Sequence, residues 1–191
     1  MVKPARPVHG EFADFLGILE FAMDRTWRGL VTFYTVFVID LASRRVQILG
    51  STPHPNEAFM GQVARTLTMA DGGPCRVLIC DRDAKWSTPV RERLRDAGIR
   101  VIQTPYRAPN ANAHAERFVR SIKGECLNRL ISFGERHFRQ AVAEFVAHYH
   151  GERNHQGLRN ELIEGEPATD VGRIRRRQRP GGLLNYYARA A

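Results

Sequence analysis

A run of β-branched and aromatic residues from Leu30 to Asp40 dominates the first quarter of the chain. Val, Phe, Tyr and Thr favour strands, and a nearly continuous apolar run indicates a strand that is buried on both faces. The preceding segment, Ile18–Asp24, alternates apolar and polar residues, and Val46–Ser51 has a similar composition. Because only short turns separate these three segments, the sequence predicts an antiparallel meander.

Strand and helix patterns alternate after the meander. Short apolar strands are expected at Arg76–Cys80 and Arg100–Thr104, and helices at 55–70, Pro89–Ala97, Ala113 to about Leu130, and Phe138–His150. Gly98 follows the second helix at a typical stop position. This order predicts an α/β fold with a five-stranded mixed sheet, antiparallel in its first three strands, and with helices on both faces.

The length of 191 residues fits one domain of roughly 100–200 residues. We expect an N-terminal arm over residues 1–16, with Phe12–Leu16 as a short helical approach, a core over 17–150, and a loop-like basic tail over 151–191. No apolar run approaches the ~20 residues that span a bilayer, and the first ten residues lack the pattern of a secretory signal. The three cysteines form no CxxC pair, so we expect neither a disulfide framework nor a structural zinc site. A cytoplasmic protein with no membrane partner is therefore predicted.

The formal net charge is +9, from 29 Lys and Arg against 20 Asp and Glu. Such a balance favours a polyanionic partner, most often nucleic acid. The densest basic cluster is Arg173–Arg179. Side chains of this kind contact phosphates without reading the base sequence, and we assign that role to three of them. These are Arg175, Arg176 and Arg177.

Two acidic residues stand where a metal site could form. Asp81 directly follows a predicted strand, and Glu116 lies in the first turn of a predicted helix, with 34 residues between the two. Ligands gather at the carboxyl ends of strands in open α/β sheets, and carboxylate oxygens bind divalent cations. With a third carboxylate from the central strand, two metal ions could be held for an in-line phosphoryl displacement.

Glu116 shares one face of its predicted helix with Arg120 and Lys123, at i, i+4 and i+7. A carboxylate followed by two cations is the pattern expected of a metal ligand beside a phosphate-binding strip. A simple salt bridge between Glu116 and Arg120 explains the same spacing, so both interpretations stay open.

Several stretches of the sequence carry a family resemblance. They are Ser51–Phe59, Asp81–Trp86 (DRDAKW), Arg107–Phe118 (RAPNANAHAERF), Ser121–Leu127 (SIKGECL), Tyr149–Leu158 (YHGERNHQGL) and Arg175–Tyr187. Together they resemble the retroviral-integrase-type catalytic core of bacterial insertion-sequence DDE transposases. The resemblance runs from about Leu30 to the C-terminus.

The resemblance implies a ribonuclease-H-like fold, two Mg²⁺ or Mn²⁺ ions, and cleavage and transfer of DNA strands. It implies transposon ends and target DNA as partners, a homo-oligomer on that DNA, a location at the bacterial nucleoid, and no small-molecule cofactor. Asp81 and Glu116 match the second and third catalytic acids of the family. Further DNA contacts are expected from Lys85, Arg107, Arg120, Lys123, Arg153 and His155.

The first catalytic acid is less clearly placed. The family has an Asp in the middle of the first strand, about seven residues before the hairpin turn, and a hairpin fixes register by distance from its turn. Glu20, followed by Phe21, occupies this place, and we favour it. Asp24 lies closer to the turn, and Asp14 lies upstream; both remain alternatives. A Glu moves the carboxylate out by one methylene, so a catalytically impaired DNA-binding remnant is the alternative hypothesis.

Overall fold

The computed structural model of the chain describes residues 13–25, 29–69, 77–105, 113–130, 134–164, 172–179 and 182–190. Its strands are β1 (Ala13–Arg25), β2 (Gly29–Asp40), β3 (Val46–Thr52), β4 (Val77–Cys80), β5 (Arg100–Gln103), β6 (Arg173–Arg179) and β7 (Leu184–Ala190). Its helices are α1 (Glu57–Met69), α2 (Thr88–Asp96), α3 (Ala113–Glu125) and α4 (Gly134–Gly151), with short 3₁₀ turns at Leu127–Arg129 and Gln156–Leu158.

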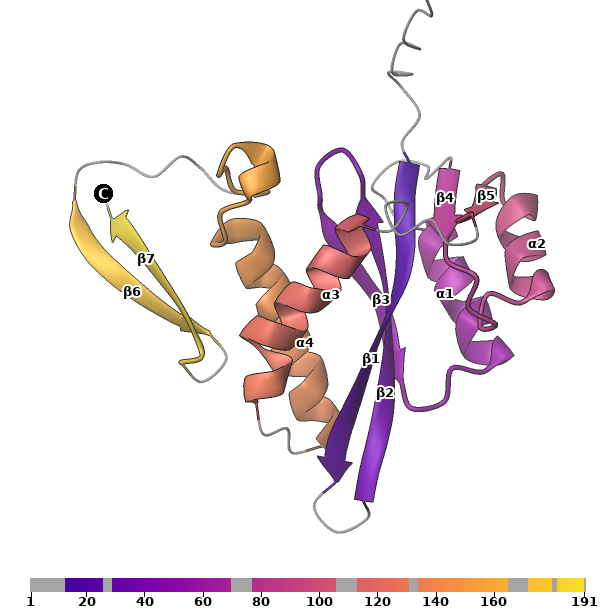
Figure 1. Cartoon of the computed structure of the whole chain (residues 1–191), viewed down its shortest axis with the longest axis horizontal. Helices are drawn as coiled ribbons and strands as arrows, with labels where there is room; N and C mark the ends of the chain where they lie inside the picture. Colours follow the sequence, from indigo (N-terminus) through magenta and orange to yellow (C-terminus); the bar gives the residue numbers. More distant parts are fainter. Residues whose placement is uncertain are drawn as a thin grey trace, which may run out of the picture.

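The first five strands form one sheet in the order β3-β2-β1-β4-β5 (Figure 1). The pairs β1–β2 and β2–β3 are antiparallel, and the pairs β1–β4 and β4–β5 are parallel. The predicted meander and the alternation that comes after it are therefore confirmed, and the sheet is mixed as expected. This order places the two parallel partners, β1 and β4, side by side at the centre.

Strand β1 begins earlier than the sequence suggests. The predicted helical approach is wrong from Ala13 onward, because Ala13–Leu16 pairs in parallel with Val77–Cys80 of β4. The predicted boundary at residue 16 therefore cuts through a strand of the sheet. The cause is tertiary: hydrogen bonds to β4 fix these residues as a strand, although their own pattern of side chains does not alternate clearly.

Hydrophobic clusters lie on both faces of the sheet, and each has its own pair of helices (Figure 1). Because side chains alternate along a strand, Phe33 and Phe37 of β2 join α3 and α4 in one cluster, whereas Val36 and Val38 join α1 and α2 in the other. Phe21 of β1 stacks on Phe138 of α4, with ring centroids 5.9 Å apart. The sheet thus carries a separate core on each face.

The helices agree with the sequence prediction, with shifted ends. α1 begins two residues after Pro55, and Gly98 takes the expected left-handed conformation, with φ of 83°, after α2. α3 ends at Glu125 rather than near Leu130, and α4 begins at Gly134 rather than at Phe138. These differences affect helix ends, where side-chain periodicity is least informative.

The basic C-terminal segment is not loop-like throughout, as the sequence analysis expected. β6 and β7 form an antiparallel two-stranded sheet in which Arg177 stands opposite Tyr186. Leu184, only 8% exposed, belongs to the cluster formed with α3 and α4. Leu184 explains why the arginine-rich β6 can form a strand. The buried side chain that holds the hairpin against the core comes from its partner β7, and not from β6 itself.

Among the helices that the structure describes, none is long and apolar enough to cross a membrane. Cys80 and Cys126 are free, buried thiols. Burial raises the pKa of each thiol from 9.0 to about 11, so both stay protonated at neutral pH.

A close approach between β1 and β2 yields a test of this core. A Cβ atom added at Gly17 would lie 2.5 Å from Cζ of Phe37, whereas one added at Gly124 on the exposed face of α3 would meet nothing within 4 Å. Gly17→Ala is expected to destabilise the fold by about 1–3 kcal/mol through overpacking. Gly124→Ala, the matched control, is expected to be neutral or stabilising by up to about 1 kcal/mol. Urea unfolding measures both, and equal stabilities would contradict this close packing of Gly17 against Phe37.

Candidate active site and nucleic-acid interface

Asp81 lies directly after β4, at the carboxyl end of a parallel strand, and is half-buried. Its Oδ1 accepts a hydrogen bond from the backbone N–H of Asp83, at 3.1 Å. Burial raises the pKa of the Asp81 carboxyl above its ordinary value of 3.8, and the hydrogen bond from Asp83 offsets part of that rise. A desolvated carboxylate of this kind is stabilised by any cation that comes to it.

Such a cation is present in the loop after β4. The ammonium group of Lys85 lies 2.9 Å from Oδ2 of Asp83 and 3.2 Å from Oε1 of Glu20, and 4.8 Å from the ring centroid of Tyr34. Burial acts to lower the pKa of Lys85, but the bonds to the two carboxylates outweigh it and raise the pKa above 10.5. Lys85 therefore stays charged and ties the strand β1 to the loop after β4.

The three candidates for the first acid have different surroundings. Glu20 has a side chain that is 53% exposed and reaches the loop after β4 through Lys85. Asp14 lies opposite Asp40 in β2 and level with Leu78 in β4. The side chain of Asp24 lies outside the described part of the structure. The structure therefore links Glu20 to the loop that begins with Asp81, and the choice of first acid stays a prediction.

Glu116 lies in the first turn of α3 and is exposed. The opposite face of the helix, which includes Phe118 and Ile122, is buried against the sheet. Arg120 is also exposed, and among the described residues no ion pair joins it to Glu116. The helix thus presents Glu116 and Arg120 to solvent as separate charges, and the salt-bridge interpretation of their spacing finds no support.

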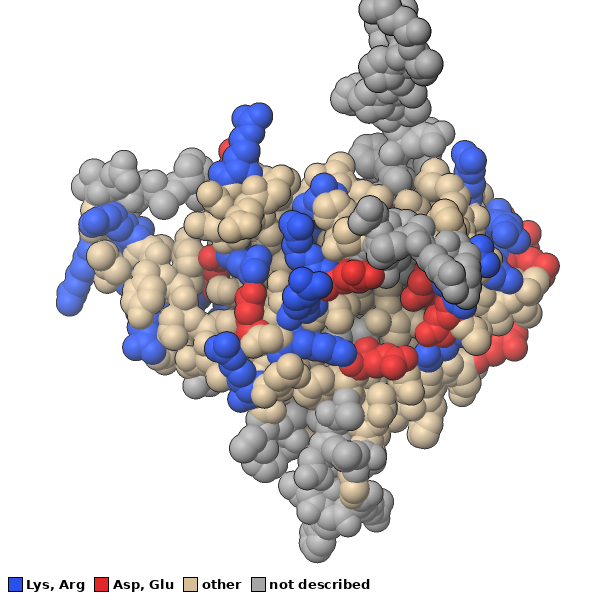
Figure 2. Space-filling view, in the orientation of Figure 1, with Lys and Arg blue, Asp and Glu red and all other residues tan. Residues whose placement is uncertain are grey.

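Acidic side chains gather in the middle of the face shown in Figure 2, between α3 and the end of the sheet that carries α2. Lys and Arg side chains border them over α3. In the described ranges, however, no three His, Cys, Asp or Glu side chains are close enough to form a metal-binding group. The structure therefore does not assemble Asp81, Glu116 and Glu20 into one cluster, and their joint role as ligands stays a prediction.

Two of the expected DNA contacts make close contacts within the protein. Arg153 binds Glu125 through two nitrogens, with the shortest distance 2.8 Å, and its guanidinium lies 5.7 Å from the ring centroid of Tyr149. His155 is buried, and its Nε2–H donates to the backbone carbonyl of Tyr149 at 2.7 Å. The contacts with Tyr149 hold the turn after α4 against the last turn of that helix, and the bonds to Glu125 join the turn to the end of α3. Arg107 lies outside the described residues.

The basic hairpin β6–β7 is attached to α4 by a residue that the sequence analysis missed. The buried carboxylate of Glu152 accepts hydrogen bonds from Nδ1–H of His148 at 3.0 Å and from Nε–H of Arg179 at 2.9 Å, and Arg177 lies 3.4 Å away. The spacing of His148 and Glu152 at i, i+4 was the only available signal. Glu152 therefore has a structural role: its carboxylate neutralises Arg177 and Arg179, the arginines of β6 that face α4.

The three arginines predicted to contact DNA therefore differ. Arg177 faces Glu152, whereas Arg176 donates to Oδ1 of Asn185 at 2.8 Å. Ile174 lies two residues before Arg176 on the same strand and is 59% exposed. Tyr187 stands opposite Arg176 on β7 and is 60% exposed. Arg175 is exposed as well. The outer side of the hairpin thus combines basic, aromatic and aliphatic side chains in contact with solvent.

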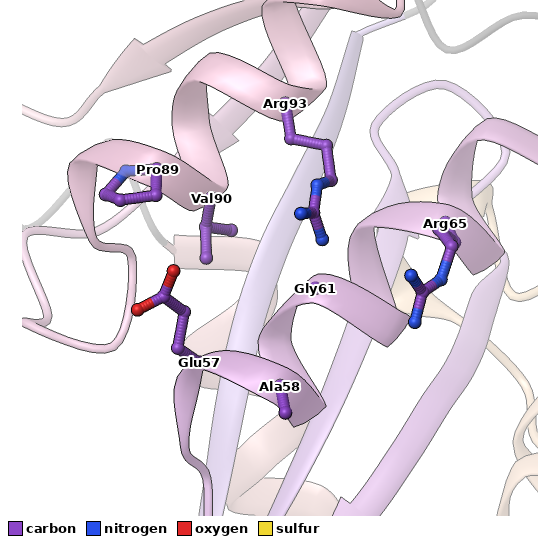
Figure 3. Close-up of a pocket in the computed structure, with 7 residues that line it drawn as sticks. All are labelled: Glu57, Ala58, Gly61, Arg65, Pro89, Val90 and Arg93. Carbon is purple, nitrogen blue, oxygen red and sulfur yellow. The ribbon is translucent and has the colours of Figure 1, made fainter.

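A separate hollow of about 350 Å³ lies between α1 and α2 (Figure 3). Glu57 and Arg65 of α1 and Arg93 of α2 line it. A Cβ atom added at Gly61 would meet the guanidinium of Arg93, so this flexible side chain lies directly over the glycine. The hollow mixes charges of both signs, and neither Asp81 nor Glu116 is among its lining residues.

Residues 97–161 match the model of a family described as "Integrase core domain". The resemblance to an integrase-type catalytic core is confirmed over these residues. This integrase-type segment includes Glu116, α3, α4 and the Tyr149–Leu158 motif, and it leaves Asp81 and Glu20 outside its limits.

No curated protein matches the chain. Among solved structures, the catalytic core domain of BIV integrase aligns with a TM-score of 0.44 at 14% identity, over 61% of this chain and 69% of that one. A likeness of this degree does not establish a shared activity.

The contacts of Glu152 predict a dependence of hairpin docking on pH. Burial acts to raise the pKa of Glu152, but hydrogen bonds from His148 and Arg179 outweigh it and hold the pKa below 4.5. A lowered pKa in the folded state means that this stabilisation is complete above pH 4.5 and is lost as the pH falls through the lowered value. Protection of the β6–β7 amides against hydrogen exchange should therefore decrease as the pH falls below 4.5, before that of β2.

Glu152→Gln tests the same bonds at neutral pH. Hydrogen bonds to a charged group contribute about 1.5–3 kcal/mol, so hairpin protection factors should fall by about tenfold or more while those of β2 hold. Glu161→Gln, at an exposed acid beyond α4, is the control. Unchanged protection of the hairpin in Glu152→Gln would show that Glu152 does not attach it.

Proposed function

We propose that this chain is the catalytic domain of a DDE-type transposase or integrase with a ribonuclease-H-like fold. The observation that carries the proposal is the position of Glu116, inside the integrase-type segment and exposed in the first turn of α3. Asp81 supports it, because a half-buried carboxylate at the carboxyl end of β4 is where ligands of an α/β sheet bind. The reaction is cleavage of a DNA strand followed by its transfer to a target.

The donor atoms suit two Mg²⁺ or Mn²⁺ ions, which Asp81, Glu116 and Glu20 would hold through carboxylate oxygens. The ammonium of Lys85 against Glu20 and Asp83 supports the fit, because it shows that the carboxylates around this loop already bind a positive charge. Bound there, divalent ions would supply charge stabilisation for the attacking and leaving oxygens of the phosphodiester.

The basic side chains position the DNA. Arg120 and Lys123 lie on α3 beside Glu116, and Lys85 lies beside Glu20, so their charges can hold phosphates on either side of the acids. Water and then a DNA 3′-hydroxyl would attack the phosphodiester in line, without a covalent protein intermediate. DNA contacts from Arg107, Arg153, His155, Arg175, Arg176 and Arg177, and a homo-oligomer on paired transposon and target DNA, complete the proposal.

One observation favours a second candidate, a DNA-binding remnant with impaired catalysis. Glu20 replaces the expected Asp, and its carboxylate is already bound to Lys85 at 3.2 Å. Lys85 would have to move before Glu20 could hold a metal ion. Mg²⁺ requires near-ideal octahedral geometry, and an error of about 1 Å in position can lower a rate by roughly a hundredfold.

An assay with supercoiled plasmid and labelled oligonucleotides tests both candidates. We expect nicked or joined DNA in Mn²⁺ but not in EDTA, and at least about a hundredfold less product from Glu116→Gln, which removes a ligand charge. Glu92→Gln, at an exposed acid on α2, should match the wild type. Product that forms equally in EDTA, or in Glu116→Gln, would contradict the transferase.

Glu20→Asp separates the two candidates. Under the transferase proposal the wild type is active and Glu20→Asp changes its rate without being needed for activity. Under the remnant proposal the wild type binds DNA without metal-dependent product, and Glu20→Asp restores product. DNA binding measured by fluorescence anisotropy accompanies each assay, so a variant that has lost binding is not mistaken for one that has lost chemistry.

A further inference from the structure

A second pocket adjoins the first turn of α3, on a different side of that helix from Glu116. It has a volume of about 270 Å³ and is enclosed by the end of β2, the β2–β3 turn, the start of α3 and the turn after α4. Arg44, Arg117 and Arg153 line it, together with His114, Tyr149 and His155. No acidic residue is among its lining residues.

Two of the three arginines have no countercharge among the described residues. Arg153 is neutralised by Glu125. Arg117, by contrast, is exposed and makes no hydrogen bond or ion pair with any residue in the described ranges. Arg44 is half-buried, and its guanidinium donates to the backbone carbonyl of Leu41, which carries no net charge. The pocket therefore holds an excess of positive charge that nothing in the described structure offsets.

The neighbouring side chains respond to this excess. Burial lowers the pKa of His114, and the charges of Arg44 and Arg117 lower it further. Burial raises the pKa of Tyr149, and the same two arginines, with Arg153, oppose that rise. The three guanidinium groups line the same pocket, although they come from three separate parts of the chain.

We propose that this pocket binds a phosphate group of the DNA backbone through Arg44 and Arg117. A guanidinium presents a planar fork of N–H donors that fits two phosphate oxygens, and two uncompensated forks around one hollow suit an anion with several oxygens. The DNA source of the phosphate rests on the proposed function. The residues themselves lie outside the set that the sequence analysis assigned to DNA.

The pocket would place a strand next to the candidate catalytic acid. Arg117 directly follows Glu116, and adjacent residues on a helix point about 100° apart. If Arg117 binds a backbone phosphate, the DNA strand that carries this phosphate would therefore lie beside the turn of α3 that contains Glu116. The turn of Tyr149–Leu158, held by His155 and by the Arg153–Glu125 pair, forms the opposite wall.

The test measures binding of a labelled DNA duplex in EDTA, as a function of salt. Each phosphate contact contributes about one unit to the slope of log affinity against log salt concentration. Arg117→Gln and Arg44→Gln should each weaken binding several-fold and reduce the slope by about one. Arg136→Gln, the control, removes an exposed arginine of α4 that has no ion pair among the described residues and should leave the slope unchanged. Thermal melting of all variants checks that each remains folded.

Three results would overturn the inference. Equal slopes for the wild type and both pocket variants would show that no DNA phosphate binds there. Inorganic phosphate that shifts the His114 and Gly157 NMR signals, with unchanged DNA slopes, would assign the pocket to a free phosphate compound instead. A wild type that binds no duplex would overturn this inference together with the proposed function.

A wild type that binds duplex but gives no metal-dependent product would overturn the transferase alone.

Discussion

Strand β1 is hydrogen-bonded on both sides, and the remainder of the fold depends on this pairing. Asp14–Arg25 pairs with β2, and Ala13–Leu16 pairs with β4. Because a strand alternates its side chains, the sheet it organises supports one core beneath α3 and α4 and another beneath α1 and α2. Gly17 lies where β1 crosses Phe37, a position that has no room for a side chain.

The same pairing places the loop after β4, which contains Asp81 and Asp83, next to Glu20 of β1. β4 ends level with Leu16, so the loop after it runs beside the part of β1 that β4 leaves unpaired. Lys85 connects the loop to β1, because its ammonium group pairs with both Asp83 and Glu20. α3 then brings Glu116 to the surface, together with the exposed cations Arg117 and Arg120. Glu116 and two cations consequently share one helix, an arrangement that is consistent with the proposed DNA substrate.

The sequence predicted the parts of the fold whose side-chain pattern matches their secondary structure. The meander, α2 with Gly98 after it, and the positions of Asp81 and Glu116 at element ends all follow from local patterns. The start of β1 did not, since pairing with β4 is a tertiary effect. The β6–β7 hairpin was missed because its arginines show no apolar alternation, and because Leu184 and Glu152 stabilise it from elsewhere in the chain. The basic pocket was missed for a related reason: Arg44 and Arg117 are 73 positions apart in sequence and meet only in the fold.

The role of Asp81 as a metal ligand is tested most directly by titrating the protein with Mn²⁺ and following the EPR signal of the free ion. If Asp81 and Glu116 are ligands, the wild type should bind Mn²⁺, and Asp81→Asn and Glu116→Gln should each weaken binding by about tenfold or more. An equal affinity in the wild type and in Asp81→Asn would contradict a metal centre at the end of β4.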